Sequence, residues 1–96
     1  MQVGIYHTIN DAQKWKQTTQ SVMGKMKDGT LPKGLKPVLF IPATNQKSTF
    51  CLWEAASIDA VKSFIDRESG TSARNEYFEV DTKSAIGLQE LAAARK

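Results

Sequence analysis

This sequence of 96 residues has little that would cross-link it, export it or anchor it in a membrane. Its one cysteine, Cys51, cannot form an internal disulfide, which fits a reducing compartment. No apolar run approaches the roughly 18 to 20 residues needed to cross a bilayer. Residues 1–9 lack the basic start and the cleavage site of a signal peptide. We therefore expect a cytoplasmic protein without a membrane partner.

The motifs of common cofactor and metal sites are missing as well. The sequence contains no G-x-G-x-x-G, P-loop or serine-elbow pattern. His7 is the sole histidine, and a ligand set of His7, Cys51 and Glu79 has no paired spacing such as C-x-x-C or H-x-x-x-H. We expect neither a metal ion nor a cofactor.

The charge balance is basic, with a net charge of +3 and a pI near 9.1. Much of the excess lies on the first expected helix and the loop after it, in Lys14, Lys16, Lys25, Lys27, Lys33 and Lys36. Such a surface could attract an anionic partner. Nucleic-acid binders usually carry a denser basic stripe with arginines and stacking aromatic residues. We interpret these lysines as a solvated face and expect no nucleic-acid partner.

The apolar patterns predict four strands and two helices. Alternation or β-forming composition predicts strands over residues 2–9, 38–42, 49–55 and 75–80. One helix is expected between an N-cap at Asn10 and a stop at Gly29, and another between a cap at Ser57 and a stop at Gly70. Their apolar stripes are Trp15, Thr18, Thr19, Val22 and Met26, and Ile58, Val61, Phe64 and Ile65.

The element order β-α-β-β-α-β predicts an α+β protein with a ferredoxin-like fold. Two split βαβ units would form one four-stranded antiparallel sheet with both helices on one face. We expect this domain to span residues 1–83, followed by a C-terminal tail over residues 84–96 that could form a short helix with Ile86, Leu88 and Leu91.

One sheet face would be left without helices, and its apolar composition predicts that another protein surface packs on it. We expect the helix side to hold the aliphatic set Val3, Ile5, Ile9, Phe50, Leu52, Phe78 and Val80. The other side would then hold Gly4, Tyr6, Thr8, Thr49, Cys51, Trp53, Tyr77 and Glu79. This second set is too apolar for a bare surface. A second copy of the chain is the expected cover, because a two-fold dimer places the same patch on both partners.

The run TFCLWEAASIDAVKSF, residues 49–64, resembles the strand-to-helix segment of the dimeric α+β barrel superfamily. It is most similar to short members in which a Thr-Phe-Cys strand leads through an aromatic residue, Glu-Ala and a serine into the second helix. The resemblance implies a dimeric α+β barrel with its chemistry in an internal cavity. The superfamily includes cofactor-free monooxygenases, muconolactone isomerases, haem-degrading enzymes, stress-response proteins and metal binders, so the resemblance leaves the activity open.

Three titratable residues are candidates for acid–base chemistry. His7 has the only side chain with an unperturbed pKa near neutrality, and Glu54 and Glu79 end two of the strands. Beside a carboxylate in a pocket, His7 should have a raised pKa, whereas burial among aliphatic residues should lower it. We expect the pocket. A strand-end histidine bonded to backbone and solvated glutamates are the simpler alternatives.

Four further residues are candidates for a ligand-binding cavity, namely Tyr6, Cys51, Trp53 and Tyr77. Each has a packing alternative: Cys51 could act as a small buried hydrophobe, and the rings of Trp53 and Tyr77 could serve dimer assembly. An RNA-recognition module has the same element order and binds RNA through aromatic rings on one sheet face. Phe50 and Trp53 lie three residues apart and would face opposite sides of the sheet, so they do not form such a surface.

Two functions of different classes therefore remain open. The first is a small dimeric protein that binds an apolar organic ligand in an aromatic cavity. The second is a small cofactor-independent enzyme, of monooxygenase or isomerase type, that uses His7 and a glutamate. No spacing forces an acid–base pair together, and this slightly favours the binding protein.

Overall fold

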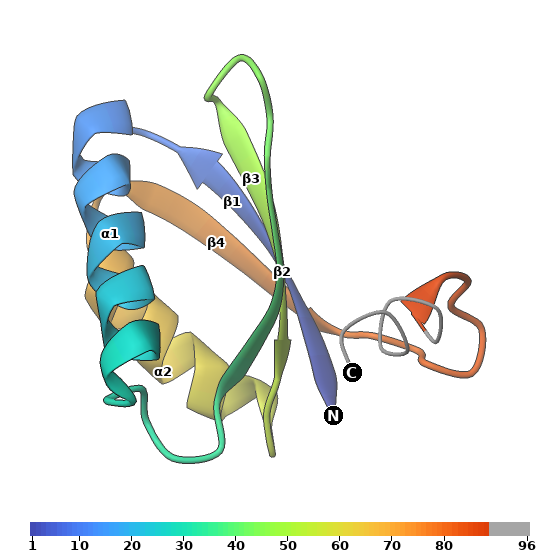
Figure 1. Ribbon diagram of the computed structural model, residues 1–96. Helices are drawn as coiled ribbons and strands as arrows, with labels where there is room; N and C mark the ends of the chain where they lie inside the picture. Colours follow the sequence, from blue (N-terminus) through green and yellow to red (C-terminus); the bar gives the residue numbers. More distant parts are fainter. Residues whose placement is uncertain (89–96) are drawn as a thin grey trace.

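The computed structural model describes residues 1–88. The elements are β1 (Gln2–Ile9), α1 (Ala12–Asp28), β2 (Lys36–Pro42), β3 (Ser48–Glu54), α2 (Ile58–Ser69) and β4 (Ala73–Glu79). The strands form one antiparallel sheet in the order β2-β3-β1-β4, and both helices lie on the same side of it (Figure 1). This confirms the predicted ferredoxin-like α+β fold. The last part of the expected tail, including Leu91, lies outside the described residues.

Local signals set the helix ends, with one correction at the start of α1. Asp11, and not Asn10, is the N-cap, because the Lys14 backbone N–H donates to Asp11 Oδ1 at 3.1 Å. The backbone N–H of Asn10 instead donates to the Ser72 carbonyl at 2.8 Å, which ties the end of β1 to the loop before β4. Gly29 ends α1 in the left-handed region at φ 71°, as expected of a C-terminal glycine.

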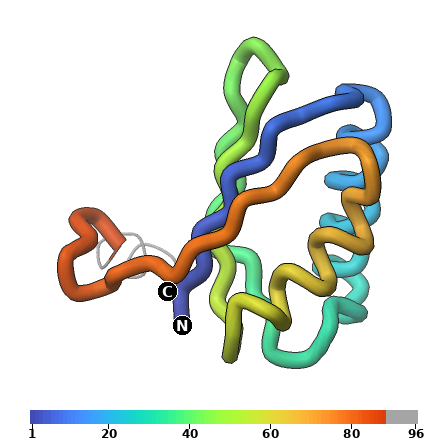
Figure 2. Tube along the Cα trace, turned by 180° about the vertical axis from the view of Figure 1, so that it is seen from behind, coloured from blue at the N-terminus to red at the C-terminus, as the bar shows by residue number. Residues whose placement is uncertain are grey.

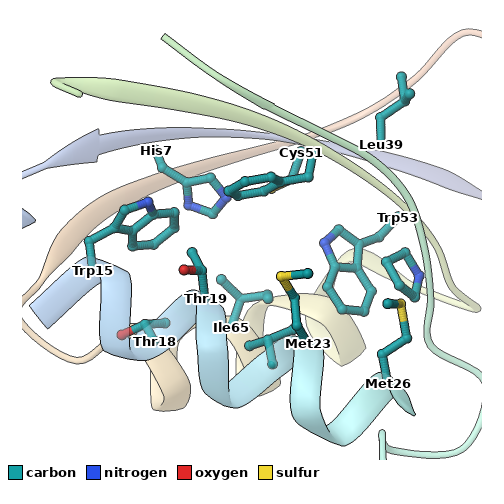
Figure 3. A pocket seen from close by; sticks show the side chains of 13 residues that line it. His7, Trp15, Thr18, Thr19, Met23, Met26, Leu39, Cys51, Trp53 and Ile65 are labelled. Atoms are coloured by element: carbon teal, nitrogen blue, oxygen red, sulfur yellow. The ribbon is translucent and has the colours of Figure 1, made fainter. Parts of the chain in front are cut away.

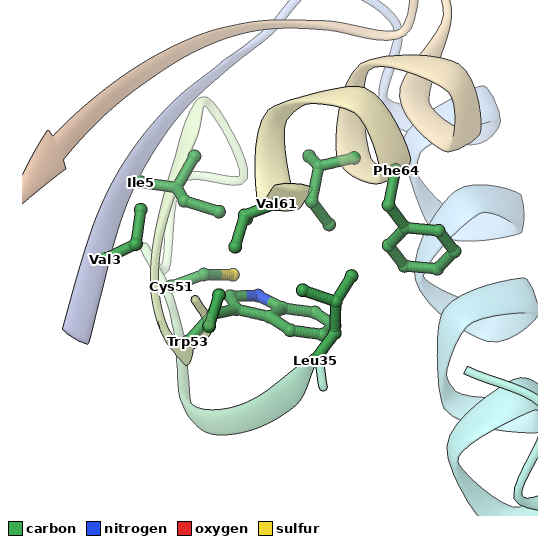
Figure 4. Packing of buried hydrophobic residues seen from close by; sticks show 9 residues of the cluster. Val3, Ile5, Leu35, Cys51, Trp53, Val61 and Phe64 are labelled. Atoms are coloured by element: carbon green, nitrogen blue, oxygen red, sulfur yellow. The ribbon is translucent and has the colours of Figure 1, made fainter. Parts of the chain in front are cut away.

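The second helix supplies most of the packing against the sheet. Ser57 caps it by accepting a hydrogen bond from the Ala60 backbone N–H at 3.1 Å. Its residues Val61, Phe64 and Ile65 are buried, as the helical spacing predicted. They meet Val3 and Ile5 of β1 and Trp53 of β3 in the core (Figure 4). Since these contacts join α2 to the sheet centre, α2 and the sheet form the stable part of the fold.

The first helix is attached differently. None of its residues is fully buried, and of its apolar stripe only the partly buried Val22 packs against the core cluster. It lies along α2, where Thr18 Oγ1 donates to the Glu68 carbonyl at 3.3 Å and Lys25 Nζ to Glu68 Oε1 at 2.9 Å. No helix within residues 1–88 combines the length and the apolar character needed to span a bilayer.

The predicted assignment of residues to the two sheet faces is half wrong. Residues paired directly across antiparallel strands project to the same face. Ile5 pairs with Cys51 and with Tyr77, and Val3 pairs with Trp53, so all five lie on the helix side. Thr49, opposite the buried His7, lies there too. Glu79 pairs with Val3 and so belongs to the same set. Cys51, Trp53, Tyr77, Thr49 and Glu79 had been expected on the other face. The alternation of residues along each strand could be predicted from the sequence. Which of the two alternating sets in a strand lies on the helix side depends on the register between strands.

The face away from the helices, here called the open face, carries the remaining set. Tyr6 pairs with Phe50 and Gly4 with Leu52 and Phe78, and the paired strands β2 and β3 add Leu39 and Ile41. Phe50, Leu52 and Phe78 had been expected on the helix side. The ring of Phe78 lies over Gly4, so closely that a Cβ added at Gly4 would overlap Phe78 Cζ. Because Gly4 has no side chain, the Phe78 ring of β4 can lie over the neighbouring strand β1.

Candidate ligand-binding site

A cavity of about 80 Å³ lies between α1 and the sheet. The cavity forms because α1 packs on α2, while the apolar stripe of α1 lies over β3 without being fully buried against it. The sheet contributes His7 from β1 and Cys51 and Trp53 from β3, and α1 contributes Trp15, Thr19 and Met23 among others (Figure 3). The lining is almost wholly apolar, which suits an uncharged occupant.

The mouth of the cavity is apolar and exposed. Met23, Met26 and Phe40 are 52 %, 46 % and 49 % exposed, although all three border the cavity. A second hollow of about 320 Å³, toward the β2–β3 turn, shares Trp15, Thr19 and Phe40 with the first. These three side chains form a wall common to the two hollows, which lie next to each other along α1. Unbranched methionine side chains adapt their shape readily, so this mouth can fit occupants of different outline.

His7 is the most deeply buried polar side chain of this lining. It is 1 % exposed, and its ring stands 4.6 Å from that of Trp15, centroid to centroid. Its Nδ1 lies 2.6 Å from Asn75 Oδ1 on β4. Its Nε2 is buried and has no hydrogen-bond partner among the described residues. An unpaired buried polar atom is uncommon in folded proteins and points to a use.

Asn75 is itself held by α2. Its Nδ2 donates to Asp66 Oδ1 at 3.0 Å and to Ser69 Oγ at 2.9 Å. Asp66 Oδ1 also accepts from the Tyr77 hydroxyl at 2.5 Å, and Asp66 Oδ2 from Lys62 Nζ at 3.1 Å. The result is a chain of hydrogen bonds from the surface carboxylate of Asp66 through Asn75 to the buried ring of His7.

The titration of these groups follows from their surroundings. Burial lowers the pKa of His7, while the Asn75 hydrogen bond and the charge of Asp66 act in the opposite direction. Partial burial acts to raise the pKa of Asp66, but hydrogen bonds from Tyr77, Asn75 and Lys62 and the Lys62 charge together hold it below its ordinary value. Burial raises the pKa of Tyr77, and Asp66 reinforces this effect.

The pKa of His7 is therefore lowered, where a pocket beside a carboxylate had been expected to raise it. The expected glutamates lie elsewhere. Glu54 pairs with Gln2, five positions from His7 along β1, and Glu79 pairs with Val3, four positions away. At about 3.3 Å per residue these separations are roughly 16 Å and roughly 13 Å. Both glutamates are exposed. His7 thus lines the cavity without either of them.

The four predicted ligand-binding residues divide evenly. Cys51 and Trp53 line the cavity, whereas Tyr6 projects from the open face and Tyr77 bonds to Asp66 beside the core. Burial raises the pKa of the Cys51 thiol to about 12, so at neutral pH it is a neutral, weakly polar part of the wall.

Sequence reasoning missed two groups that matter to the site, Asn75 and Asp66. An asparagine alternating with Ala73 and Tyr77 in an inward-facing set is a signal that could have pointed to a buried polar contact. Asp66 gave no such signal, since exposed acidic residues on helices are common. Among residues 1–88, no three or more His, Cys, Asp or Glu side chains gather as a possible metal site.

Comparison with known proteins bears on the family and the fold. The family described as "Domain of unknown function (DUF8652)" matches residues 3–88. No protein of curated function matches the sequence. The crystal structure of SCO4226 from Streptomyces coelicolor A3(2) is similar with a TM-score of 0.57 and 19 % identity, over 84 % of this chain and 96 % of that one. At this identity the likeness shows the fold alone.

A second solved structure is that of a candidate antibiotic biosynthesis monooxygenase from Caulobacter crescentus CB15. It has a TM-score of 0.49 and 17 % identity, over 82 % of this chain and 89 % of that one. This lower score carries no argument of its own. The likeness to SCO4226 and the strand order confirm the ferredoxin-like α+β fold that the sequence resemblance implied.

Proposed function

The chain belongs to the DUF8652 family, and from the geometry of its cavity we propose that it is a dimeric ligand-binding protein of the α+β barrel type. The ligand is a small organic molecule that is mostly apolar. It enters between α1 and β2 and lies against Trp15 and Trp53. The observation that carries this proposal is the apolar cleft under α1, whose helix stripe faces the sheet without being buried.

One property of the cleft favours ligand binding over simple packing of α1 on the sheet. A helix that served only to cover the sheet would bury its apolar stripe, because burial of each large apolar side chain contributes roughly 1.5 to 3 kcal/mol. Here Met23 and Met26 stay about half exposed at the cavity mouth. An occupant would cover them and provide that burial.

The open face supports the dimer. Tyr6, Ile41 and Phe78 are 47 %, 52 % and 47 % exposed on one sheet face, together with the partly buried Phe50. Monomers seldom expose a contiguous apolar patch of this kind. A second copy related by a two-fold axis would cover the patch with the same patch. The cavity lies on the other side of the sheet, so dimer formation and ligand entry would not compete.

A small acid–base enzyme is the second candidate, with His7 as the base and without Glu54 or Glu79. The buried imidazole and its hydrogen-bond chain to Asp66 favour it. The lowered pKa counts against it, because it makes His7 a weaker base. Binding therefore remains the first proposal.

Tryptophan fluorescence tests the proposal directly, because the only two tryptophans, Trp15 and Trp53, both line the cavity. Toluene, a single apolar ring, should change the emission in a saturable way. Thr19→Phe places a ring in the space that toluene would take and should weaken binding at least about tenfold.

Gln20→Phe is the matched control, since Gln20 is the next residue on α1, is exposed and does not line the cavity. It should bind toluene like the unchanged protein. Saturable binding that Thr19→Phe leaves intact, or no binding at all, would refute the cavity as the site.

A further inference from the structure

We propose that His7 Nε2 is the hydrogen-bond acceptor of the cavity, and that it selects small uncharged molecules that carry an O–H or N–H donor on an apolar ring, as phenols do. This inference rests on the proposed function, because it names the class of molecule that the cavity binds. It also assigns Asn75 and Asp66 as positioning residues that hold the His7 ring.

The hydrogen-bond chain determines which ring nitrogen carries the proton. Asn75 Nδ2 lies 3.0 Å from the Asp66 carboxylate, and a carboxylate only accepts, so the amide nitrogen must face it. Asn75 Oδ1 then faces His7 Nδ1 at 2.6 Å. Because a carbonyl oxygen also only accepts, Nδ1 bears the hydrogen. In the neutral ring Nε2 is left with a lone pair and acts as an acceptor.

The sheet order determines where that lone pair points. Asn75 lies on β4, on one side of β1, whereas Cys51 and Trp53 lie on β3, on the other side. The two nitrogens of an imidazole point in nearly opposite directions. With Nδ1 toward β4, Nε2 therefore points toward β3, the strand that carries the cavity-lining Cys51 and Trp53. Nε2 is itself covered, so a neighbouring side chain must move before the donor of an occupant reaches it.

The protein supplies no donor to this acceptor within the described residues. His7 Nε2 has no partner there, although His7 is 1 % exposed. The threonine hydroxyls of the lining are engaged elsewhere: Thr18 Oγ1 shares its one hydrogen between Lys14 O at 3.1 Å and Glu68 O at 3.3 Å, and Thr19 Oγ1 donates to Lys16 O at 2.9 Å. An occupant that brings its own O–H or N–H donor would satisfy this acceptor.

The same lining excludes other classes. A carboxylate or phosphate would bring only acceptors to the lone pair and would lose its hydration in an apolar space. A cation would find one partner there. The cavity of about 80 Å³ is smaller than the roughly 150 Å³ apolar cavity that holds benzene, so a single ring fits only if part of it lies in the open mouth, and a larger ligand does not fit. A phenol fits these limits, with its ring between Trp15 and Trp53 and its hydroxyl at His7.

Phenol and toluene test this inference, since they have nearly the same shape and differ in the hydroxyl. Their dissociation constants should be measured by tryptophan fluorescence for the unchanged protein and for His7→Leu, with excitation beyond the phenol absorption band. The ratio of phenol affinity to toluene affinity should fall about 2- to 10-fold in His7→Leu, with toluene binding retained. An unchanged ratio would overturn the inference.

A second measurement needs no variant and decides the question if His7→Leu does not fold. The chain has one histidine, so a long-range ¹H–¹⁵N spectrum shows both ring nitrogens without ambiguity. Free protein should show Nδ1 protonated and Nε2 bare. Saturating phenol should shift the Nε2 resonance strongly, and saturating toluene should not.

The two proposals fail in different ways. If both probes bind and Nε2 responds to neither, or if Nε2 is the protonated nitrogen, the role of His7 is refuted while the cavity remains a binding site. If neither probe binds, the proposed function fails and this inference fails with it.

Discussion

At the residue scale, His7 combines two environments that were considered as alternatives. It is buried on the helix side of β1 beside Val3 and Ile5, and it also lines the cavity. Its position in an alternating strand could not distinguish these cases, because the cavity is on the same face as the core. His7 differs from an ordinary core residue in the hydrogen bonding of its ring: Nδ1 is bonded to Asn75, whereas Nε2 has no partner among the described residues.

The pH dependence of stability should report this environment. In the folded protein the pKa of His7 lies below 6.5 because burial disfavours the charged ring. Below about pH 6.5 the unfolded chain takes up a proton that the folded chain does not. His7 therefore contributes stability that is complete above about pH 6.5 and is lost as the pH falls toward the folded pKa.

Urea denaturation at about pH 7.5 and about pH 5.5 measures this loss, and an NMR titration of the imidazole gives the folded pKa directly. In His7→Gln, whose amide does not titrate, stability should change less over the same interval. A folded pKa above 6.5 would contradict the lowered value and would mean that the surroundings of the ring favour its charged form.

At the scale of elements, the two helices have different roles. Helix α2 contributes Val61, Phe64 and Ile65 to the core and holds Asn75 through Asp66 and Ser69. Helix α1 contributes no buried residue and forms one wall of the cavity. An element with few buried contacts opens at lower free energy than the rest of the fold, and this suits α1 to admit a ligand.

Truncation of the two tryptophans should separate these roles. Trp53 is 3 % exposed and meets Phe64 of α2 at 6.1 Å between ring centroids. Trp53→Ala should lower the free energy of unfolding by about 3 to 5 kcal/mol, because it leaves a large core cavity. Trp15 is only partly buried on α1. Trp15→Ala should therefore cause less than about half that loss.

Urea denaturation followed by circular dichroism gives both values on one scale. Equal losses in the two variants would show that α1 is as strongly packed as the sheet centre, and the account of α1 as a loosely attached wall would then be wrong.

At the scale of the whole molecule, the sheet separates two apolar regions. The helix side holds the core and the cavity, and the open face holds Tyr6, Ile41, Phe50 and Phe78. The segment after β4 leaves on the side away from the helices (Figure 2). The proposed dimer would bury the open face and leave the cavity mouth free.

Light scattering at micromolar concentration should give the mass of two chains. Ile41→Glu should shift it to one chain, since a charge would be buried in the proposed interface. Met23→Glu is a control of equal exposure, because both residues are 52 % exposed and Met23 lies on the helix side. A one-chain mass for the unchanged protein, or dissociation by Met23→Glu alone, would refute the interface on the open face.

Sequence patterns determined the order of the elements, the ends of the helices to within a residue or two and the buried stripe of α2. These features depend on local chemistry: capping by Ser57, the stop at Gly29 and helical spacing of apolar residues. The sequence also indicated His7, Cys51 and Trp53 as candidates, because a lone histidine, a lone cysteine and a strand tryptophan are rare enough to notice.

Only the tertiary structure decided which candidates meet. The pairing of Ile5 with Cys51 and Tyr77 places about half of the strand residues on the face opposite to the one expected from the sequence. The hydrogen bond between His7 and Asn75 joins residues 68 positions apart. Alternation along a strand is a local property that leaves the two faces equivalent. The strand register removes that equivalence, and so it is the register that brings His7 to the cavity and leaves Glu54 and Glu79 at the end of the sheet.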